Sequence, residues 1–422
     1  MTTVLETLQA RGLFEAMTSP ELAEHVRKPT TVYAGFDPTS RSLQIGNLVA
    51  IMGLAHFQRA GHKAVALVGG ATGLIGDPSG KPQERQLLSV EDVATNLEGI
   101  RENLGRFLDF ECRINPAKLV NNQDWMQRFS YIDFLRDVGK HFRMGAMLAR
   151  ESVRARMESE AGLSYTEFSY QLLQAYDFLH LCDNEGCRVQ IGGSDQWGNI
   201  TAGTDLIRRL RSVEAFGLTF PILCDHTGAK FGKSAGNAIY LDATRTSCYD
   251  FYQYFLRTDD KDVARYLKIL TFLPLDSIAA IEEATRTAPD QRLAQRTLAE
   301  ELTRMVHGEN GLRSAEQASA ALFGGTLAGL NAADLLAVFT QAPSSELPRA
   351  QVVGQPVVDV AVAAGLVSSK SAVRRLIADG GLYLNNERIT DAAACVTPAQ
   401  AIEDRLLVLR QGKRNYRLVR LV

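Results

Sequence analysis

The most constraining feature of the sequence is a strand, turn and helix pattern near the N-terminus that is followed by a second predicted strand. Residues 31–33 are β-prone and lead through a Gly- and Pro-containing turn into an apolar helical period that runs to about Ala60. A second predicted strand, residues 64–68, enters a glycine-rich turn that ends at Asp77. This alternation predicts an α/β fold, a Rossmann-like doubly wound parallel sheet with its site at the carboxyl ends of the strands.

Two polar loops are candidates for phosphate contacts. The first follows the opening strand, where a helix N-terminus presents unpaired N–H groups, and Gly46 in its first turn would let a flat base approach the backbone. An ordinary βα turn is the alternative. The second loop, residues 228–234, reads Gly-Ala-Lys-Phe-Gly-Lys-Ser and contains Lys230 and Lys233. It is not a Walker A loop, because only three residues separate its two glycines.

A polar stripe on an apolar helix is a candidate ligand site. Tyr170, Gln174 and Asp177 occur at i, i+4 and i+7, while the surrounding positions are mostly apolar. A stripe of this kind is usually a solvated face, but on a buried helix its polar groups need a partner. A polar ligand would supply that partner.

Further candidates follow the predicted strands. Asp195 and Gln196 stand at the carboxyl end of one strand, after a Gly-Gly turn, where ligand contacts or helix capping are expected. The polar residues 79–85 predict a mobile loop with Lys81 and Arg85, for which a solvated surface loop is the alternative.

Bulk properties exclude several classes of protein. The 422 residues are 45% hydrophobic and 22% charged with a formal net charge of −2, as in a globular protein whose RNA-binding surface would have to be local. The six cysteines contain no C-x-x-C pair, so neither a disulfide framework nor a metal site is indicated. The sequence shows no signal peptide or membrane span, which favours a cytoplasmic protein.

The C-terminal block, from about Val357, is locally basic. It combines a predicted capped helix with short strands, which predicts a surface that follows a phosphate backbone. The basic candidates in this block are Lys370, Arg374, Arg375, Lys413 and Arg414. Arg208 and Arg209, in an earlier basic run, either meet RNA or are simply exposed.

These motifs resemble a known family. The segments Gln44-Ile-Gly-Asn47 and Lys230-Phe-Gly-Lys-Ser234 resemble the HIGH and KMSKS signatures of class I aminoacyl-tRNA synthetases, and residues 68–80, 168–177 and 190–199 closely resemble the bacterial tyrosyl-tRNA synthetases. The C-terminal block resembles an S4-like RNA-binding domain. Both histidines of the first signature are replaced, by Gln44 and Asn47.

Pattern and resemblance together imply a domain order. We expect a Rossmann-like catalytic domain with a helical insertion at about 90–158, a KMSKS-type loop and connecting segment, an α-helical anticodon-side domain, a linker and a small α+β S4-like domain. Their expected boundaries are 1–222, 223–247, 248–323, 324–356 and 357–422. In the family the insertion forms the interface of a homodimer.

The resemblance implies a two-step reaction. L-tyrosine and ATP, the latter with Mg²⁺, give tyrosyl-adenylate and pyrophosphate, and the tyrosyl group then moves to the 3′ end of tRNA(Tyr). No bound organic cofactor and no membrane partner are expected. Since the carboxylate of tyrosine is already an ionised nucleophile, catalysis would rest on positioning and electrostatics.

Carry-over of the motif positions assigns roles to single residues. Tyr33 and Asp177 would bind the phenol of the substrate. The other residues expected to contact tyrosine are Asp77, Tyr170, Gln174 and Gln196. The residues expected at ATP are Gly46, Gly193, Asp195 and Lys233. The residues expected to stabilise the departing pyrophosphate or the transition state are Thr39, Gln44, Asn47, Lys81, Arg85, Lys230, Lys233 and Ser234.

Three alternatives remain at this point. Gln44 and Asn47 keep amide donors but cannot carry charge, so a non-catalytic paralogue that acts as an RNA-binding protein is conceivable. The related tryptophan-specific synthetase is disfavoured, because a Tyr/Asp pair suits a phenol. A generic nucleotidylyltransferase would leave the basic C-terminal block unexplained.

Overall fold

The computed structural model describes residues 2–78, 88–148, 153–154, 157–158, 162–234, 237–321, 325–327, 329–340, 342–412 and 415–422. The chain divides into two compact units, Met1–Asp242 with Thr258–Leu298 and Ala243–Arg257 with Ala299–Val422. No helix in these residues is long and apolar enough to cross a membrane.

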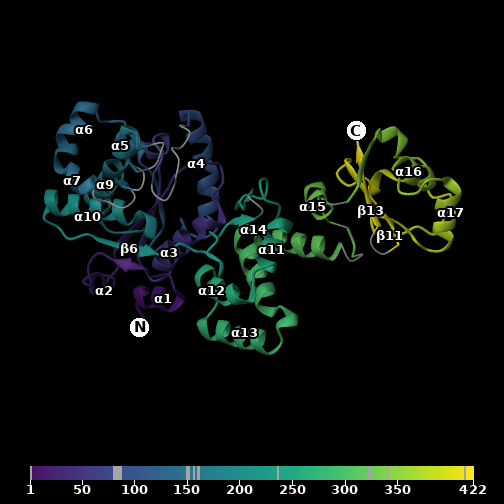
Figure 1. Cartoon of the computed structure of the whole chain (residues 1–422), viewed down its shortest axis with the longest axis horizontal. Coiled ribbons are helices and arrows are strands. Elements are labelled where there is room, and N and C mark those ends of the chain that lie inside the picture. The colour runs from purple at the N-terminus through teal and green to yellow at the C-terminus, as the bar shows by residue number, and fades with distance from the viewer. Residues whose placement is uncertain are drawn as a thin grey trace. The chain divides into compact units, whose positions relative to one another are not determined.

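The first unit is built on a six-stranded sheet in the order β1-β6-β5-β2-β3-β4 (Figure 1). All neighbouring strands are parallel except β1, which pairs antiparallel with β6 at one edge. The doubly wound α/β prediction is therefore confirmed. The strands are β1 Ala16–Met17, β2 Thr31–Phe36, β3 Lys63–Val68, β4 Lys118–Asn121, β5 Cys187–Gly193 and β6 Phe216–Phe220.

The helices of this unit cover the sheet and frame the carboxyl ends of its strands. Contacts of α3 with β2, β3 and β5 cover the centre of the sheet, and α9 packs against α10. The helices are α1 Val4–Arg11, α2 Leu22–His25, α3 Leu48–Arg59, α4 Val90–Leu104, α5 Gln123–Met126, α6 Tyr131–Asp137, α7 Met144–Leu148, α9 Tyr165–Glu185, α10 Trp197–Arg211, α12 Asp260–Leu270 and α13 Leu275–Thr287.

One strand lies in a region that the sequence predicts as mainly helical. The segment Lys118–Asn121 forms β4, which extends the sheet by pairing in parallel with β3. The β-prone pair Leu119-Val120 faces the otherwise unpaired edge of β3, so tertiary pairing decides the local conformation. This strand brings Asn121 and the following residues beside the site.

The second unit contains a five-stranded sheet in the order β11-β10-β12-β13-β9, with helices packed against it (Figure 1). Its strands are β9 Ser344–Leu347, β10 Leu382–Leu384, β11 Glu387–Arg388, β12 Leu406–Gln411 and β13 Asn415–Leu421. Its helices are α11 Cys248–Leu256, α15 Ala332–Val338, α16 Val357–Ala363 and α17 Lys370–Ala378, together with the larger part of α14 Leu293–Ala321.

The segment between α14 and α16 contributes to the core of this second unit. Leu335 of α15 and the following Phe339 are buried in one cluster with Val408 and Tyr416, and the Phe339 and Tyr416 rings lie 4.7 Å apart. Strand β9 joins the sheet by pairing in parallel with β13. The domain boundaries expected from the sequence, including a linker at 324–356, stay a prediction.

Candidate active site

A cavity of about 790 Å³ opens at the carboxyl ends of β2 and β5 in the first unit. Most of the residues singled out from the sequence line it, although they come from segments far apart in the chain. The predicted residues that line the cavity are Tyr33, Thr39, Gln44, Gly46, Asn47, Asp77, Tyr170, Gln174, Asp177, Gly193, Asp195, Gln196 and Lys230.

Backbone pairing brings the two signature segments together. Ile45 N donates to Ile239 O at 3.0 Å, and Leu241 N donates to Leu43 O at 2.9 Å. At Gly232, whose φ is +98°, an added Cβ would lie 3.2 Å from Cγ1 of Ile45. The chain after the lysine loop therefore lies directly against the chain before α3, and this close approach favours glycine.

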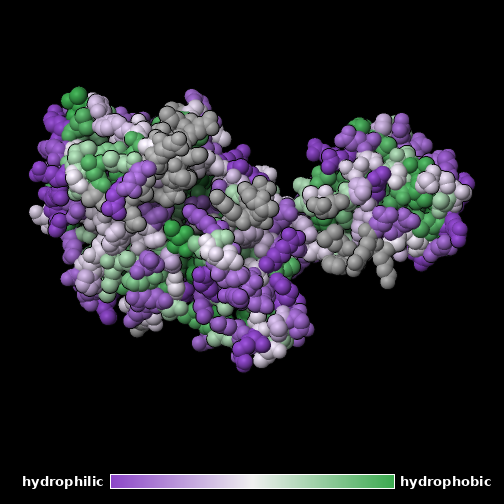
Figure 2. Space-filling model, viewed as in Figure 1, coloured by the Kyte–Doolittle hydropathy of each residue, from purple (hydrophilic) through white to green (hydrophobic). Residues whose placement is uncertain are grey.

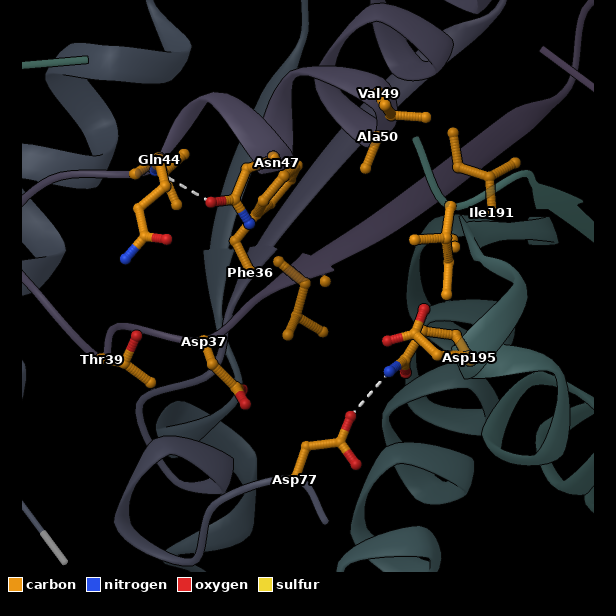
Figure 3. A pocket seen from close by; sticks show the side chains of 18 of the residues that line it. Phe36, Asp37, Thr39, Gln44, Asn47, Val49, Ala50, Asp77, Ile191 and Asp195 are labelled. Atoms are coloured by element: carbon orange, nitrogen blue, oxygen red, sulfur yellow. Dashed lines mark hydrogen bonds between the residues drawn. The ribbon is translucent and has the colours of Figure 1, made fainter. Parts of the chain in front are cut away.

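Gln44 and Asn47 close the turn that begins α3. The backbone N of Gln44 donates to Oδ1 of Asn47 at 3.0 Å, and the backbone N of Asn47 donates to the Gln44 carbonyl at 2.8 Å. Figure 3 shows the side chain of Gln44 extending away from Asn47 on the side of the cavity where Thr39 lies. Asn47 thus has a structural task in the turn, whereas the Gln44 amide faces the cavity.

Gly46 has open space beside it among the residues that the structure describes. An added Cβ would come no closer than 3.9 Å to its nearest neighbour, the Phe231 carbonyl oxygen. In contrast, an added Cβ at Gly193 would lie 2.5 Å from Oδ1 of Asp195. The close neighbour at 193 is the end of the Asp195 side chain, whereas at 46 the described residues leave room for a ligand.

The deep end of the cavity holds a buried carboxylate with two donors. Trp125 Nε1 donates to Asp177 Oδ1 at 2.8 Å, and Asn122 Nδ2 donates to Asp177 Oδ2 at 3.0 Å. The buried Tyr33 hydroxyl, which also lines the cavity, has no hydrogen-bond partner within the described residues. A buried unpaired hydroxyl is costly, so a polar ligand at this end would relieve it.

Burial has the largest effect on the pKa values of Asp177 and Tyr33. It raises the pKa of Asp177 to about 7, although the hydrogen bonds from Asn122 and Trp125 act in the opposite direction. Burial and the neighbouring Asp177 carboxylate raise the pKa of Tyr33 well above its ordinary value. Tyr33 therefore keeps its proton at neutral pH and can donate it in a hydrogen bond.

The middle of the cavity is acidic and linked by hydrogen bonds. Gln196 Nε2 donates to Asp77 Oδ2 at 2.7 Å, and Gln196 Oε1 accepts from Gln174 Nε2 at 3.2 Å. Tyr170 OH donates to the Asp37 carboxylate at 3.1 Å. Figure 3 shows Asp37 and Asp77 pointing toward the same space. Two carboxylates with oriented oxygens suit a bound ammonium group.

Asp195 lies at the opposite side of this space, on the short turn η4 Ser194–Gln196. Burial, and then the negative charge of Asp77, raise the pKa of Asp195, while Lys230 lowers it. Its carboxylate is an acceptor suited to hydroxyl groups, such as those of a ribose.

The outer end of the cavity carries the donors expected at phosphate. Thr39 and the exposed Lys230 line it. Lys233 and Ser234 form the short strand β7, which pairs antiparallel with β8 Asn237–Ala238, and only their backbone is described. Lys81 and Arg85 lie outside the described residues, so their predicted roles stay predictions.

None of the described residues predicted to bind RNA is among those that line this cavity. On α10, Arg208 pairs with Asp205 at 2.9 Å, and Arg209 donates to the His141 carbonyl at 2.6 Å. The remaining described candidates, Lys370, Arg374 and Arg375, lie on α17 in the second unit. Lys413 and Arg414 lie outside the described residues.

Sequence reasoning missed four residues of the site. Asn122 and Trp125 hold Asp177, Asp37 accepts from Tyr170, and the buried Oε1 of Gln190 faces the cavity without a partner in the described part of the chain. Trp125 is buried, and a buried indole N–H requires an acceptor. The need for an acceptor near the Trp125 indole was the signal in the sequence that could have indicated this part of the site.

Comparison with known proteins defines the class. Residues 25–324 match the family described as tRNA synthetases class I (W and Y), and residues 334–419 match the tyrosine–tRNA ligase SYY-like C-terminal domain. The chain belongs to the class I tRNA synthetase family.

Individual relatives narrow this class. Tyrosine–tRNA ligases of Roseiflexus castenholzii and Geobacillus stearothermophilus are each 50% identical to the chain, over 100% of both chains and 99% of both chains respectively. A C-terminally truncated mitochondrial tyrosyl-tRNA synthetase of Aspergillus nidulans superposes with a TM-score of 0.69 at 32% identity, covering 76% of this chain and 95% of that one.

Proposed function

We propose that the protein is a tyrosine–tRNA ligase. It would activate L-tyrosine with ATP to give tyrosyl-adenylate and pyrophosphate, and then transfer the tyrosyl group to the 3′ end of tRNA(Tyr). Full-length similarity to tyrosine–tRNA ligases supports this activity over that of a non-catalytic RNA-binding paralogue. The single structural observation that carries the substrate assignment is the buried Tyr33 hydroxyl, which has no partner among the described residues and lines a cavity that ends at Asp177.

The proposed tyrosine site would contact both ends of the substrate. The phenol would donate to Asp177 and accept from Tyr33. The ammonium group would meet Asp77, Tyr170 and Gln174, with Gln196 near the carboxylate. Phenylalanine has no hydroxyl, so the buried Tyr33 hydroxyl would stay unpaired at a cost of about 1–3 kcal/mol, and Asp177 would keep only its hydrogen bonds from Trp125 and Asn122.

The proposed chemistry needs no nucleophile from the protein. The tyrosine carboxylate attacks the α-phosphorus of ATP, and the bond to the bridging oxygen of pyrophosphate breaks. Thr39, Gln44 and Lys230, with Lys233, Ser234, Lys81 and Arg85, would stabilise the negative charge on the departing group. The open space at Gly46 and the Gly193–Asp195 turn would receive the adenosine.

Magnesium would enter with ATP. No group of three or more His, Cys, Asp or Glu side chains in the described residues could hold a metal ion by itself. The triphosphate would therefore provide most ligands of the ion, which matches the usual coordination of Mg²⁺ by substrate phosphates.

The homodimer expected for the family is part of the proposal. Tyr131 and Ile132 on α6 and Tyr165 at the start of α9 are each more than 60% exposed, and hydrophobic residues lie at the surface over α6 in Figure 2. Large apolar side chains gathered on one surface indicate an interaction site. Binding of tRNA would use α10 and the basic face of α17, and a cytoplasmic location is part of the same proposal.

ATP–pyrophosphate exchange that depends on the amino acid tests this function. Exchange with tyrosine, but not with phenylalanine or tryptophan, is the expected result. A folded protein that binds tRNA and exchanges with no amino acid would support the RNA-binding paralogue instead. Exchange with tryptophan alone would overturn the assignment of the substrate.

A further inference from the structure

Lys230 lies on a short hairpin whose shape is fixed by its own turn. Cys224 and Lys230 form an antiparallel bridge, and Phe231 N donates to Leu223 O at 2.9 Å. Oδ1 of Asp225 accepts from the backbone N of Ala229 at 3.0 Å and also from that of Thr227. The hairpin is therefore a compact unit, and whatever holds it also decides where Lys230 points.

The hairpin is docked on α12 through a buried carboxylate. Oδ2 of Asp262 accepts from the backbone N of His226 at 3.0 Å and lies 2.8 Å from its Nδ1. Oδ1 of Asp262 accepts from Nη2 of Arg265 at 3.1 Å. The Asp262 side chain is only 5% exposed, whereas that of His226 is 34% exposed. The Asp262 carboxylate therefore fixes the turn of the hairpin to α12.

Two more residues of α12 hold the first strand of the hairpin. Arg265 donates to the carbonyl oxygen of Cys224, and the hydroxyl of Tyr266 donates to the same oxygen at 3.3 Å. The ring of Tyr266 also packs edge-to-face on Phe231, with 4.9 Å between centroids. Contacts on both strands of the hairpin therefore converge on one face of α12.

The other end of α12 is fixed independently. Arg11 of α1 donates to the carbonyl oxygens of Lys268, Thr271 and Leu273 at 3.0, 2.9 and 2.6 Å. Lys268 lies in the last turn of α12, whose carbonyl groups lack partners within the helix, and Thr271 and Leu273 belong to the chain that follows it. Because α12 is anchored in this way, it can serve as a rigid support for the hairpin.

We propose that Asp262 is a positioning residue for the lysine hairpin, and that it acts on adenylate formation through Lys230 without contacting substrate. This inference rests on the proposed function. An exposed lysine on a free loop would sample many orientations, and restricting it before the reaction raises the fraction of productive complexes. Tyrosine binds at the other end of the cavity, so its affinity does not depend on the hairpin.

The test uses the full-length protein with Asp262→Asn and His226→Ala, and with Asp276→Asn as the matched control. Asp276 is exposed in the first turn of the neighbouring α13. Asp262→Asn places an uncharged amide against Arg265 and His226, so we expect adenylate formation to slow about tenfold, as for loss of one charge-assisted hydrogen bond. His226→Ala removes only the side-chain contact and should slow it about threefold, since the backbone N–H remains.

The dissociation constant of tyrosine, measured by equilibrium dialysis, should stay unchanged in all three variants. A loss of tyrosine affinity that parallels the loss of rate would mean a general structural defect and would overturn the proposal. His226→Ala changes a partly exposed ring, so it keeps the proposal testable if Asp262→Asn fails to fold. Equal rates for wild type, His226→Ala and Asp276→Asn would also overturn it.

A double-mutant cycle with Lys230→Ala shows whether the effect passes through the lysine. If Asp262 acts through Lys230, Asp262→Asn should cost little in the Lys230→Ala background. Additive losses would overturn the proposal. Wild-type exchange in the same assay separates the two hypotheses, because an inactive wild type defeats the proposed function, whereas an active wild type with additive variants defeats only the positioning role.

Discussion

The two ends of the cavity are built differently. At the deep end, Asp177 is buried on a long helix and held by Trp125 and Asn122. At the outer end, Lys230 is exposed on a hairpin that depends on α12 for its position. A pre-formed buried end suits selection of a substrate, and an exposed loop-borne end suits charge stabilisation that develops only during the reaction.

The largest expected effect is at the outer end. Lys230→Ala should slow adenylate formation about 10²- to 10³-fold, the range for removal of one group that stabilises transition-state charge. Tyrosine affinity should remain at its wild-type value, because the lysine does not reach the phenol end. Pre-steady-state adenylate formation and equilibrium dialysis measure the two quantities. Equal losses in the rate of adenylate formation and in tyrosine affinity would mean that the two ends of the cavity do not differ in function.

The deep end should show the reverse pattern. Asp177→Asn keeps the size of the side chain but replaces one acceptor oxygen by a donor, which then opposes either Trp125 or Asn122. We expect tyrosine to bind about 10- to 100-fold more weakly, as for loss of a hydrogen bond to a charged group. Phenylalanine affinity should change far less. A uniform loss for both amino acids would show that Asp177 acts on folding of the site and not on the phenol.

Much of this arrangement could be predicted from the sequence, and the reasons are local. The strand, turn and helix at 31–60 and the polar stripe on α9 are patterns within one element, and each lies where the periodicity predicts. Asn122 and Trp125 follow β4, whose pairing with β3 joins parts of the chain about fifty residues apart. The contact between α12 and the lysine hairpin joins His226 with Asp262, which are 36 positions apart in the sequence. No spacing rule connects these two residues.

Gln44 provides a smaller test of the outer end. Its amide faces the cavity without carrying charge, so its share in stabilising phosphate should equal that of one neutral hydrogen bond. Gln44→Ala should therefore lower the rate of adenylate formation by about fivefold, corresponding to roughly 1 kcal/mol. Asn47→Ala makes a useful contrast, because Asn47 also caps the turn before α3 and its loss should lower thermal stability as well. A wild-type rate for Gln44→Ala would show that this amide has no catalytic share.

The smallest predicted effect is a pH dependence of tyrosine affinity, which should come from the deep end of the cavity and not from the outer end. Burial raises the pKa of Asp177 to about 7, so the carboxylate becomes ionised as the pH rises through neutrality. The charged form is the stronger acceptor for a phenol, and tyrosine affinity should rise about threefold between roughly pH 6 and pH 8. Asp177→Asn should abolish this dependence, whereas Lys230→Ala should leave it intact.

The same titration should act on stability with the opposite sign. Because the pKa of Asp177 is higher in the folded state than in the unfolded chain, the folded protein retains the proton longer, and its free energy of unfolding falls as the pH rises through the folded pKa. The slope from this group alone is at most about 1.4 kcal/mol for each pH unit between the two pKa values. Denaturant unfolding of wild type and Asp177→Asn across this range measures it as a difference. If both proteins lose stability equally, another group is responsible for the pH dependence. Ionisation of Asp177 would then not lower the free energy of unfolding.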